Sequence, residues 1–208
     1  LNEGIYIEEI KKYATYFFAF DLEAYPERLR NYIRFLFLRY IKFSKKEKLY
    51  KKYVQGEYDY EIAFLEGPVT KIIAGSKSRT PKYAWVHVDL INLPDSNKYY
   101  RSKEEAKECY NFYNKILCVS SDVKTSFLKI YDVDEEKVQV QLNVLDTNKI
   151  LNSIKNVTEY KRQNPLNLIT VGRLSPQKGY DRLLKCCVRL KEDKLTFKLK
   201  IVRSEERR

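Results

Sequence analysis

The sequence contains little glycine, a single histidine and no methionine: its 208 residues include 6 Gly, one His and no Met. One histidine and the absence of any Cys-x-x-Cys pair exclude the usual zinc-binding patterns, so we expect no metal site. No apolar run approaches the ~18 residues that a membrane-spanning helix needs. Because the chain starts with Leu1 and stops at Arg208, soon after a strand-like run, we expect a fragment at both ends.

Cysteine is also sparse, and its four occurrences form no metal-binding or redox pattern. Cys118 lies in an apolar run, and Cys186 and Cys187 lie in a helical pattern. Together with Cys109 they are expected to be buried free thiols in a reducing compartment.

Positive charge is abundant. The 40 Lys and Arg against 28 Asp and Glu give a net charge of +12, so the expected partners are anionic: phosphates, nucleic acid or an acidic membrane surface. Charge alone does not choose among them. The most basic stretch is 28–53, where an apolar stripe at helical spacing runs from Leu29 to Ile41 and leaves Phe35 and Phe43 outside it. This predicted helix either rests on an anionic membrane or packs on the neighbouring sheet with its cations in water.

Alternating strand and helix patterns fill the rest of the chain. Strands are predicted at 60–65, 82–88, 115–119, 137–142, 166–171 and 196–202, with helical patterns between them. Such alternation predicts an α/β fold with parallel, doubly wound sheets. The polar stretch near 160 reads as a linker, which predicts an N-terminal domain over 1–155, a linker at 156–165 and the start of a second domain at 166–208.

Two of the six glycines, Gly172 and Gly179, enclose an arginine, a proline and a lysine in the stretch VGRLSPQKGYDRLLK, 171–185. Gly172 follows a strand, where ligands of open α/β sheets bind. Ser175 and Pro176 fit the cap and the first residue of a helix. Arg173 and Lys178 flank that helix start, which suits an anion. The glycine spacing matches neither a Walker A loop nor the dinucleotide fingerprint, so an anion site and an ordinary loop with solvated cations both stay open.

The same stretch closely resembles the start of the C-terminal domain of retaining glycosyltransferases of family 4, which have the GT-B fold. Three further segments resemble that family in the right order: EYDYEIAFLEG with KYAWVHVDL, then KILCVSSDVKTSF, then KVQVQLNVLD. The resemblance covers about 58–202. It implies two Rossmann-like doubly wound domains, the second truncated here, with the nucleotide-sugar donor held by the C-terminal domain and the acceptor by the N-terminal one.

The resemblance also implies site residues. Arg173 and Lys178 would bind the donor diphosphate beside Gly172, and His87 would act at the donor sugar or phosphate as the catalytic histidine. Asp89, Ser120 and Asn143 would line the cleft. From the residues alone, Asp89 fits an exposed loop acid equally well, and capping and turn formation explain Ser120 and Asn143. No cofactor or metal is implied, because the nucleotide sugar is the substrate.

Several features of the family's pattern are missing. A Glu-x-x-x-x-x-x-x-Glu motif of its donor site would lie beyond this chain, the first glycine-rich loop is not found, and we assign no nucleophile. The expected activity is retaining transfer of a hexose-type sugar onto a glycan or lipid-linked acceptor in surface polysaccharide or glycoconjugate biosynthesis, with this fragment alone inactive. The expected location is cytoplasmic, peripheral on the inner face of the cell membrane through 28–53.

Two other functions are compatible with the sequence. A nucleic-acid-binding module would use the cations and the 18 Tyr to contact phosphates and stack bases, although no specific nucleic-acid motif is recognisable. A non-catalytic interaction protein would retain the fold of a transferase without its chemistry.

Overall fold

The structure is a computed structural model that describes residues 7–15, 24–92, 97–154 and 164–202. Its contacts divide the chain into two compact units, Leu1–Leu145 and Asp146–Arg208, and each unit is described by itself. The domain limits given by the sequence stay predictions.

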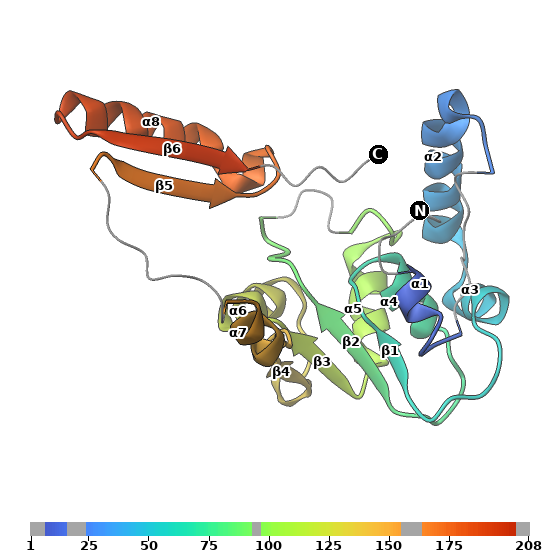
Figure 1. Ribbon diagram of the computed structural model, residues 1–208. Helices are drawn as coiled ribbons and strands as arrows, with labels where there is room; N and C mark the ends of the chain where they lie inside the picture. Colours follow the sequence, from blue (N-terminus) through green and yellow to red (C-terminus); the bar gives the residue numbers. More distant parts are fainter. Residues whose placement is uncertain (1–6, 16–23, 93–96, 155–163, 203–208) are drawn as a thin grey trace. The chain divides into compact units, whose positions relative to one another are not determined.

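The first unit is built on a four-stranded sheet. Strands β1 (Glu61–Ala63), β2 (Lys82–Val86), β3 (Lys115–Cys118) and β4 (Val138–Val140) lie side by side in chain order, and every neighbouring pair is parallel (Figure 1). The α/β class and the parallel pairing predicted from the sequence are confirmed. The change in strand order that defines a doubly wound sheet does not occur among these four strands, so that part of the prediction stays open.

Three helices cover one face of this sheet: α4 (Pro68–Ile73), α5 (Lys103–Asn111) and α6 (Ser121–Ile130). Alternate strand residues such as Ala84, Val86 and Ile116 point into a core shared with Cys109 of α5 and Phe127 of α6. Right-handed crossovers between parallel strands in sequential order place every connecting helix on the same side, which explains the single covered face.

Tyrosine is a core residue in this unit. Tyr100, Tyr110, Tyr113 and Tyr131 are each at most 2 % exposed. The Tyr110 ring packs edge-on against Phe127 with centroids 4.8 Å apart, and the Tyr113 hydroxyl donates to the Thr70 carbonyl oxygen at 2.7 Å. Burial raises the pKa of these phenols, that of Tyr131 to about 12. Part of the tyrosine excess therefore serves packing rather than base stacking.

The basic stretch forms two helices rather than the one that its periodicity predicted. Helix α2 (Glu27–Phe43) ends where the backbone of Ser44 and Lys45 is extended, and α3 (Lys46–Tyr53) follows. A tertiary contact marks the end of α2, because the buried Lys71 ammonium donates to the Lys42 carbonyl oxygen at 2.8 Å. The apolar and aromatic stretch 5–20 also predicts a helix, of which the described residues show α1 (Ile7–Ile10), while 16–20 lie outside them.

The second unit contains a strand–helix–strand motif. Strands β5 (Leu166–Val171) and β6 (Phe197–Val202) pair in parallel, with α8 (Tyr180–Glu192) between them, and α7 (Thr147–Ile154) comes before β5. No apolar side chain in the described part of this unit is fully buried. Cys186 is exposed and Cys187 is half-buried, so the prediction of four buried thiols holds only for Cys109 and Cys118, which lie in the larger core of the first unit.

Among the described residues, no helix combines enough length with enough apolar character to cross a membrane.

Candidate functional site

The candidate anion loop starts at the carboxyl edge of the β5–β6 pair. Gly172 directly follows β5, and its N–H donates to the Val202 carbonyl oxygen at the end of β6 at 3.0 Å. The parallel ladder therefore continues to the first residue of the loop. This edge is where parallel sheets bind ligands, as the sequence predicted for Gly172.

The loop enters its helix in two steps. Pro176–Lys178 form one turn of 3₁₀ helix, Gly179 then takes a left-handed conformation at φ 63°, and α8 begins at Tyr180. The prediction that the α-helix begins at Pro176 is thus wrong by one turn, because the left-handed Gly179 interrupts the helical backbone. Ser175 occupies the cap position of the 3₁₀ turn, but its hydroxyl makes no capping bond.

Gly172 has a reason to be glycine that involves no ligand. The Tyr180 hydroxyl donates to the Gly172 carbonyl oxygen at 3.3 Å. A Cβ on Gly172 would lie 3.0 Å from that hydroxyl oxygen. The glycine therefore leaves room for Tyr180, whose helical spacing with Leu183, Leu184 and Cys187 by itself predicts only a place on the apolar face of the helix.

The two cations of the loop are open to an incoming anion. Arg173 and Lys178 are both exposed, and neither forms an ion pair with an acid in the described part of the chain. They flank the N-terminus of a 13-residue helix, whose dipole adds partial positive charge. Asp181 in the first turn already offsets part of that charge. The buried Ser175 hydroxyl has no hydrogen-bond partner in the described structure and is a further polar group in this loop.

His87 lies in the first unit, one residue after β2. Its backbone N–H donates to Glu66 Oε2 at 3.0 Å. Its side chain lies on the sheet face opposite the core. There the imidazole ring stacks on Trp85 with ring centroids 5.9 Å apart, and its centroid lies 4.9 Å from that of the Phe64 ring. His87 Nδ1 and Trp85 Nε1 are buried and have no hydrogen-bond partner in the described structure.

Asp89 is occupied by its own loop. Its carboxylate accepts from the Ile91 N–H at 3.0 Å, from the Asn92 amide and from the Ser126 hydroxyl of α6. The hydrogen bonds from Ser126 and Asn92 lower the pKa of this carboxyl below its ordinary value. The structure therefore accounts for Asp89 as the residue that ties the loop after β2 to α6.

Ser120 and Asn143 differ in how the fold uses them. Ser120 caps α6, since its hydroxyl accepts from the Val123 N–H at 3.2 Å, which confirms the capping role that the residues favoured. Asn143 is exposed in a segment without regular structure after β4. Neither residue is brought together with Arg173 or Lys178 within one unit.

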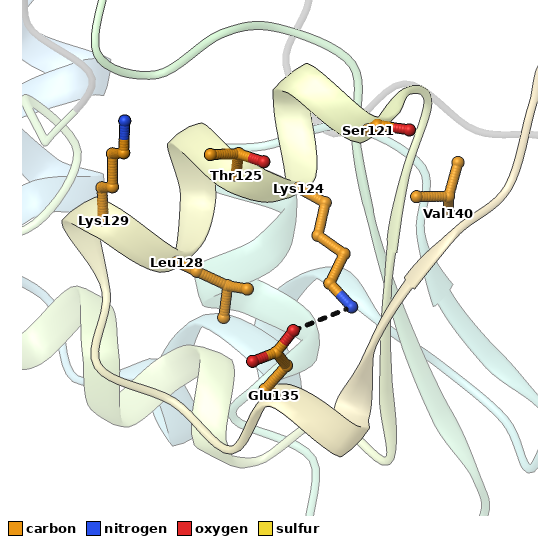
Figure 2. A pocket seen from close by; sticks show the side chains of 7 residues that line it. All are labelled: Ser121, Lys124, Thr125, Leu128, Lys129, Glu135 and Val140. Carbon is orange, nitrogen blue, oxygen red and sulfur yellow. Dashed lines mark ion pairs between the residues drawn. The ribbon is translucent and has the colours of Figure 1, made fainter.

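A hollow of about 420 Å³ lies between α6 and β4 and contains none of the residues predicted for the site (Figure 2). Lys124 and Glu135 form an ion pair of 3.3 Å across it. The side chains that line it are Ser121, Lys124, Thr125, Leu128, Lys129, Glu135 and Val140. Glu135 neutralises Lys124, so Lys129 is the one lining cation without an ion pair among the described residues, and this hollow offers less to an anion than the loop does.

In the described ranges no group of three or more His, Cys, Asp or Glu side chains is placed to hold a metal ion. Comparison with protein-family models and with curated proteins gave no match for this sequence.

Proposed function

We propose that the chain is part of a sugar transferase that uses a nucleotide-sugar donor, of the retaining family 4 type with the GT-B fold. The observation that supports this best is the β5–loop–α8 unit. In the described structure, two cations without an ion pair flank a helix N-terminus there, at the carboxyl edge of a parallel pair.

In this proposal Arg173 and Lys178 hold the diphosphate of the donor. The guanidinium of Arg173 can grip two phosphate oxygens at once, whereas the ammonium of Lys178 acts as a mobile point charge. When the bond from sugar to phosphate breaks, negative charge grows on the leaving nucleoside diphosphate. Cations held in position stabilise that charge more in the transition state than in the ground state, which speeds the transfer.

His87 is proposed to act in the first unit at the donor sugar or its phosphate. Its Nδ1 makes no hydrogen bond in the described structure, while Trp85 and Phe64 fix the plane of the ring. An imidazole held in this way can accept a hydrogen bond from a sugar hydroxyl or donate one to a phosphate oxygen. The acceptor would be a glycan or a lipid-linked sugar at a cytoplasmic membrane surface.

The test uses the two loop cations. Arg173→Ala and Lys178→Ala should each weaken binding of uridine, guanosine or adenosine diphosphate, whichever binds, by at least about tenfold in titration calorimetry. In the full-length transferase, turnover should fall by a similar factor. Both side chains are exposed, so the melting temperature should stay unchanged.

Lys191→Ala is the matched control. Lys191 lies in the last turn of α8, so the substitution removes the same charge from the same helix at its opposite end. Near-normal affinity in both loop variants, or an equal loss in Lys191→Ala, would contradict the diphosphate role.

A further inference from the structure

Helix α2 leaves a long apolar surface uncovered. Only Ile41 among its 17 residues is fully buried. Tyr32, Phe35 and Phe43 are between 57 % and 59 % exposed, and Leu36 is 41 % exposed. A soluble helix normally buries its large apolar side chains, so this surface needs an explanation.

The exposed side chains fall on one face. Tyr32, Phe35, Leu36 and Phe43 follow helical spacing. Arg28, one turn before Tyr32, and Arg39, between Leu36 and Phe43, continue the same spacing. We call this surface the arginine–aromatic face: Arg28, Tyr32, Phe35, Leu36, Arg39 and Phe43. It differs from the stripe predicted from the sequence, which left out Phe35 and Phe43. Within it the Arg39 guanidinium carbon lies 5.4 Å from the centroid of the Phe43 ring.

Charge around this face is strongly positive. Glu27–Tyr53, which spans α2 and α3, contains ten Lys or Arg and two Glu. Lys52 of α3 lies 4.7 Å from the Tyr40 ring centroid, so the charge of α3 continues beside α2. Any surface that covers the aromatic side chains must also accept these cations, and an anionic surface does.

The helix is anchored at one end. Phe37 packs edge-on against Tyr53 of α3 with ring centroids 6.4 Å apart, and the Lys42 carbonyl accepts from Lys71 of α4. These contacts hold the C-terminal end of α2 on the first unit while the face described above remains exposed.

We propose that α2 lies on an anionic membrane surface through its arginine–aromatic face. The rings and Leu36 enter the boundary between headgroups and acyl chains, and Arg28 and Arg39 bind lipid phosphates. An aliphatic side chain halfway along the face favours lipid over nucleic acid, because leucine gains from acyl chains but offers no ring to stack on a base. This proposal does not depend on sugar transfer.

Vesicle flotation tests it. The protein should float with vesicles of equal parts phosphatidylcholine and phosphatidylglycerol, much less with phosphatidylcholine alone, and less as salt rises. Arg28→Gln with Arg39→Gln should weaken binding to the anionic vesicles by at least about tenfold, since each cation near such a surface contributes about fivefold. Phe35→Ser with Phe43→Ser should weaken it by a similar factor, and this loss should persist at low salt.

Lys103→Gln with Lys129→Gln is the control for charge, because it removes two exposed cations from α5 and α6 of the same unit. It should leave flotation unchanged. The fluorescence of Trp85, the single tryptophan, checks that each variant is folded.

Three results would overturn the proposal. The first is equal binding to neutral and anionic vesicles. The second is no flotation, together with tight binding of single-stranded RNA that Arg28→Gln with Arg39→Gln abolishes, which would make the face a nucleic-acid site. The third is no flotation, together with a dimer that Phe35→Ser with Phe43→Ser dissociates, which would make a second copy the occupant.

Discussion

The glycines of the candidate loop show how the immediate surroundings of one position restrict the residue that fits there. Gly172 and Gly179 were singled out from the sequence because they bracket a charged loop. Gly172 lies beneath the Tyr180 hydroxyl, and Gly179 has a left-handed backbone. Their glycine character is therefore explained by the folding of the loop. The case for an anion rests on Arg173 and Lys178, whose charges no described acid neutralises.

Gly75 gives the clearest prediction at this scale. A Cβ there would lie 2.0 Å from the Lys46 carbonyl oxygen and 2.9 Å from the Glu47 nitrogen. These are backbone atoms, so Gly75→Ala must push α3 away from α4. We expect a loss of roughly 3 kcal/mol in the free energy of unfolding, measured by urea denaturation. Lys77→Ala, at an exposed position two residues on, should change it little, and wild-type stability in Gly75→Ala would refute the close approach.

At the scale of elements, one buried lysine joins three helices. Lys71 of α4 is fully buried, pairs with Glu105 of α5 at 3.1 Å and donates to the carbonyl of Lys42 in α2. It thus satisfies a carbonyl at the C-terminal end of α2, where a cation is also favoured by the helix dipole. The orientation of α2 depends on this contact.

Lys71→Met should destabilise the first unit by about 2 kcal/mol, less than the usual cost of leaving a buried charge unpaired, because Arg101 still pairs with Glu105. Lys71→Met with Glu105→Met should recover part of that loss in a double-mutant cycle of urea denaturation. Strictly additive losses would show that the two side chains do not interact. Lys103→Met on the exposed side of α5 controls for the loss of a lysine.

Most elements could be predicted from local patterns, and their breaks could not. The four strands of the first sheet and the strand–helix–strand order of the second unit follow from apolar runs and cap signals near in sequence. The interruption between α2 and α3 coincides with a contact from Lys71, which is 29 residues from Lys42. The cations of the candidate loop were predicted, but the contact between Tyr180 and Gly172 was missed, because an aromatic residue at helical spacing is usually part of the core.

At the scale of the whole molecule, acid should destabilise the protein through its bonded carboxylates. Burial opposes ionisation of Glu61, but hydrogen bonds from Ser76, Ser78 and Tyr50 outweigh it and lower the pKa of the carboxyl. Glu105 behaves in the same way, since bonds from Arg101 and Lys71 outweigh its burial and lower its pKa. Such groups stabilise the folded state above the ordinary glutamate pKa of 4.5. That stability is lost as the pH falls through the lower folded value.

Glu61→Gln tests this dependence. Near neutral pH the variant should be less stable by about 2 kcal/mol, because the bonds to a charged acceptor become bonds to a neutral one. Below pH 4.5 the difference should shrink, since the wild-type carboxyl becomes protonated as well. Urea denaturation from neutral pH to acid measures both, with Glu57→Gln at an exposed position as control. A difference that does not vary with pH would show that Glu61 is not ionised in the folded protein.

The sequence by itself determined the α/β class, the parallel pairing and the charged loop, because these depend on period, caps and composition within short windows. The tertiary structure alone decided which face of α2 stays exposed, why Gly75 must be glycine, and which cations are paired. Those properties arise from contacts between residues far apart in the chain. Local sequence patterns do not predict such contacts, because the same apolar stripe or lysine can be buried or exposed according to what packs against it.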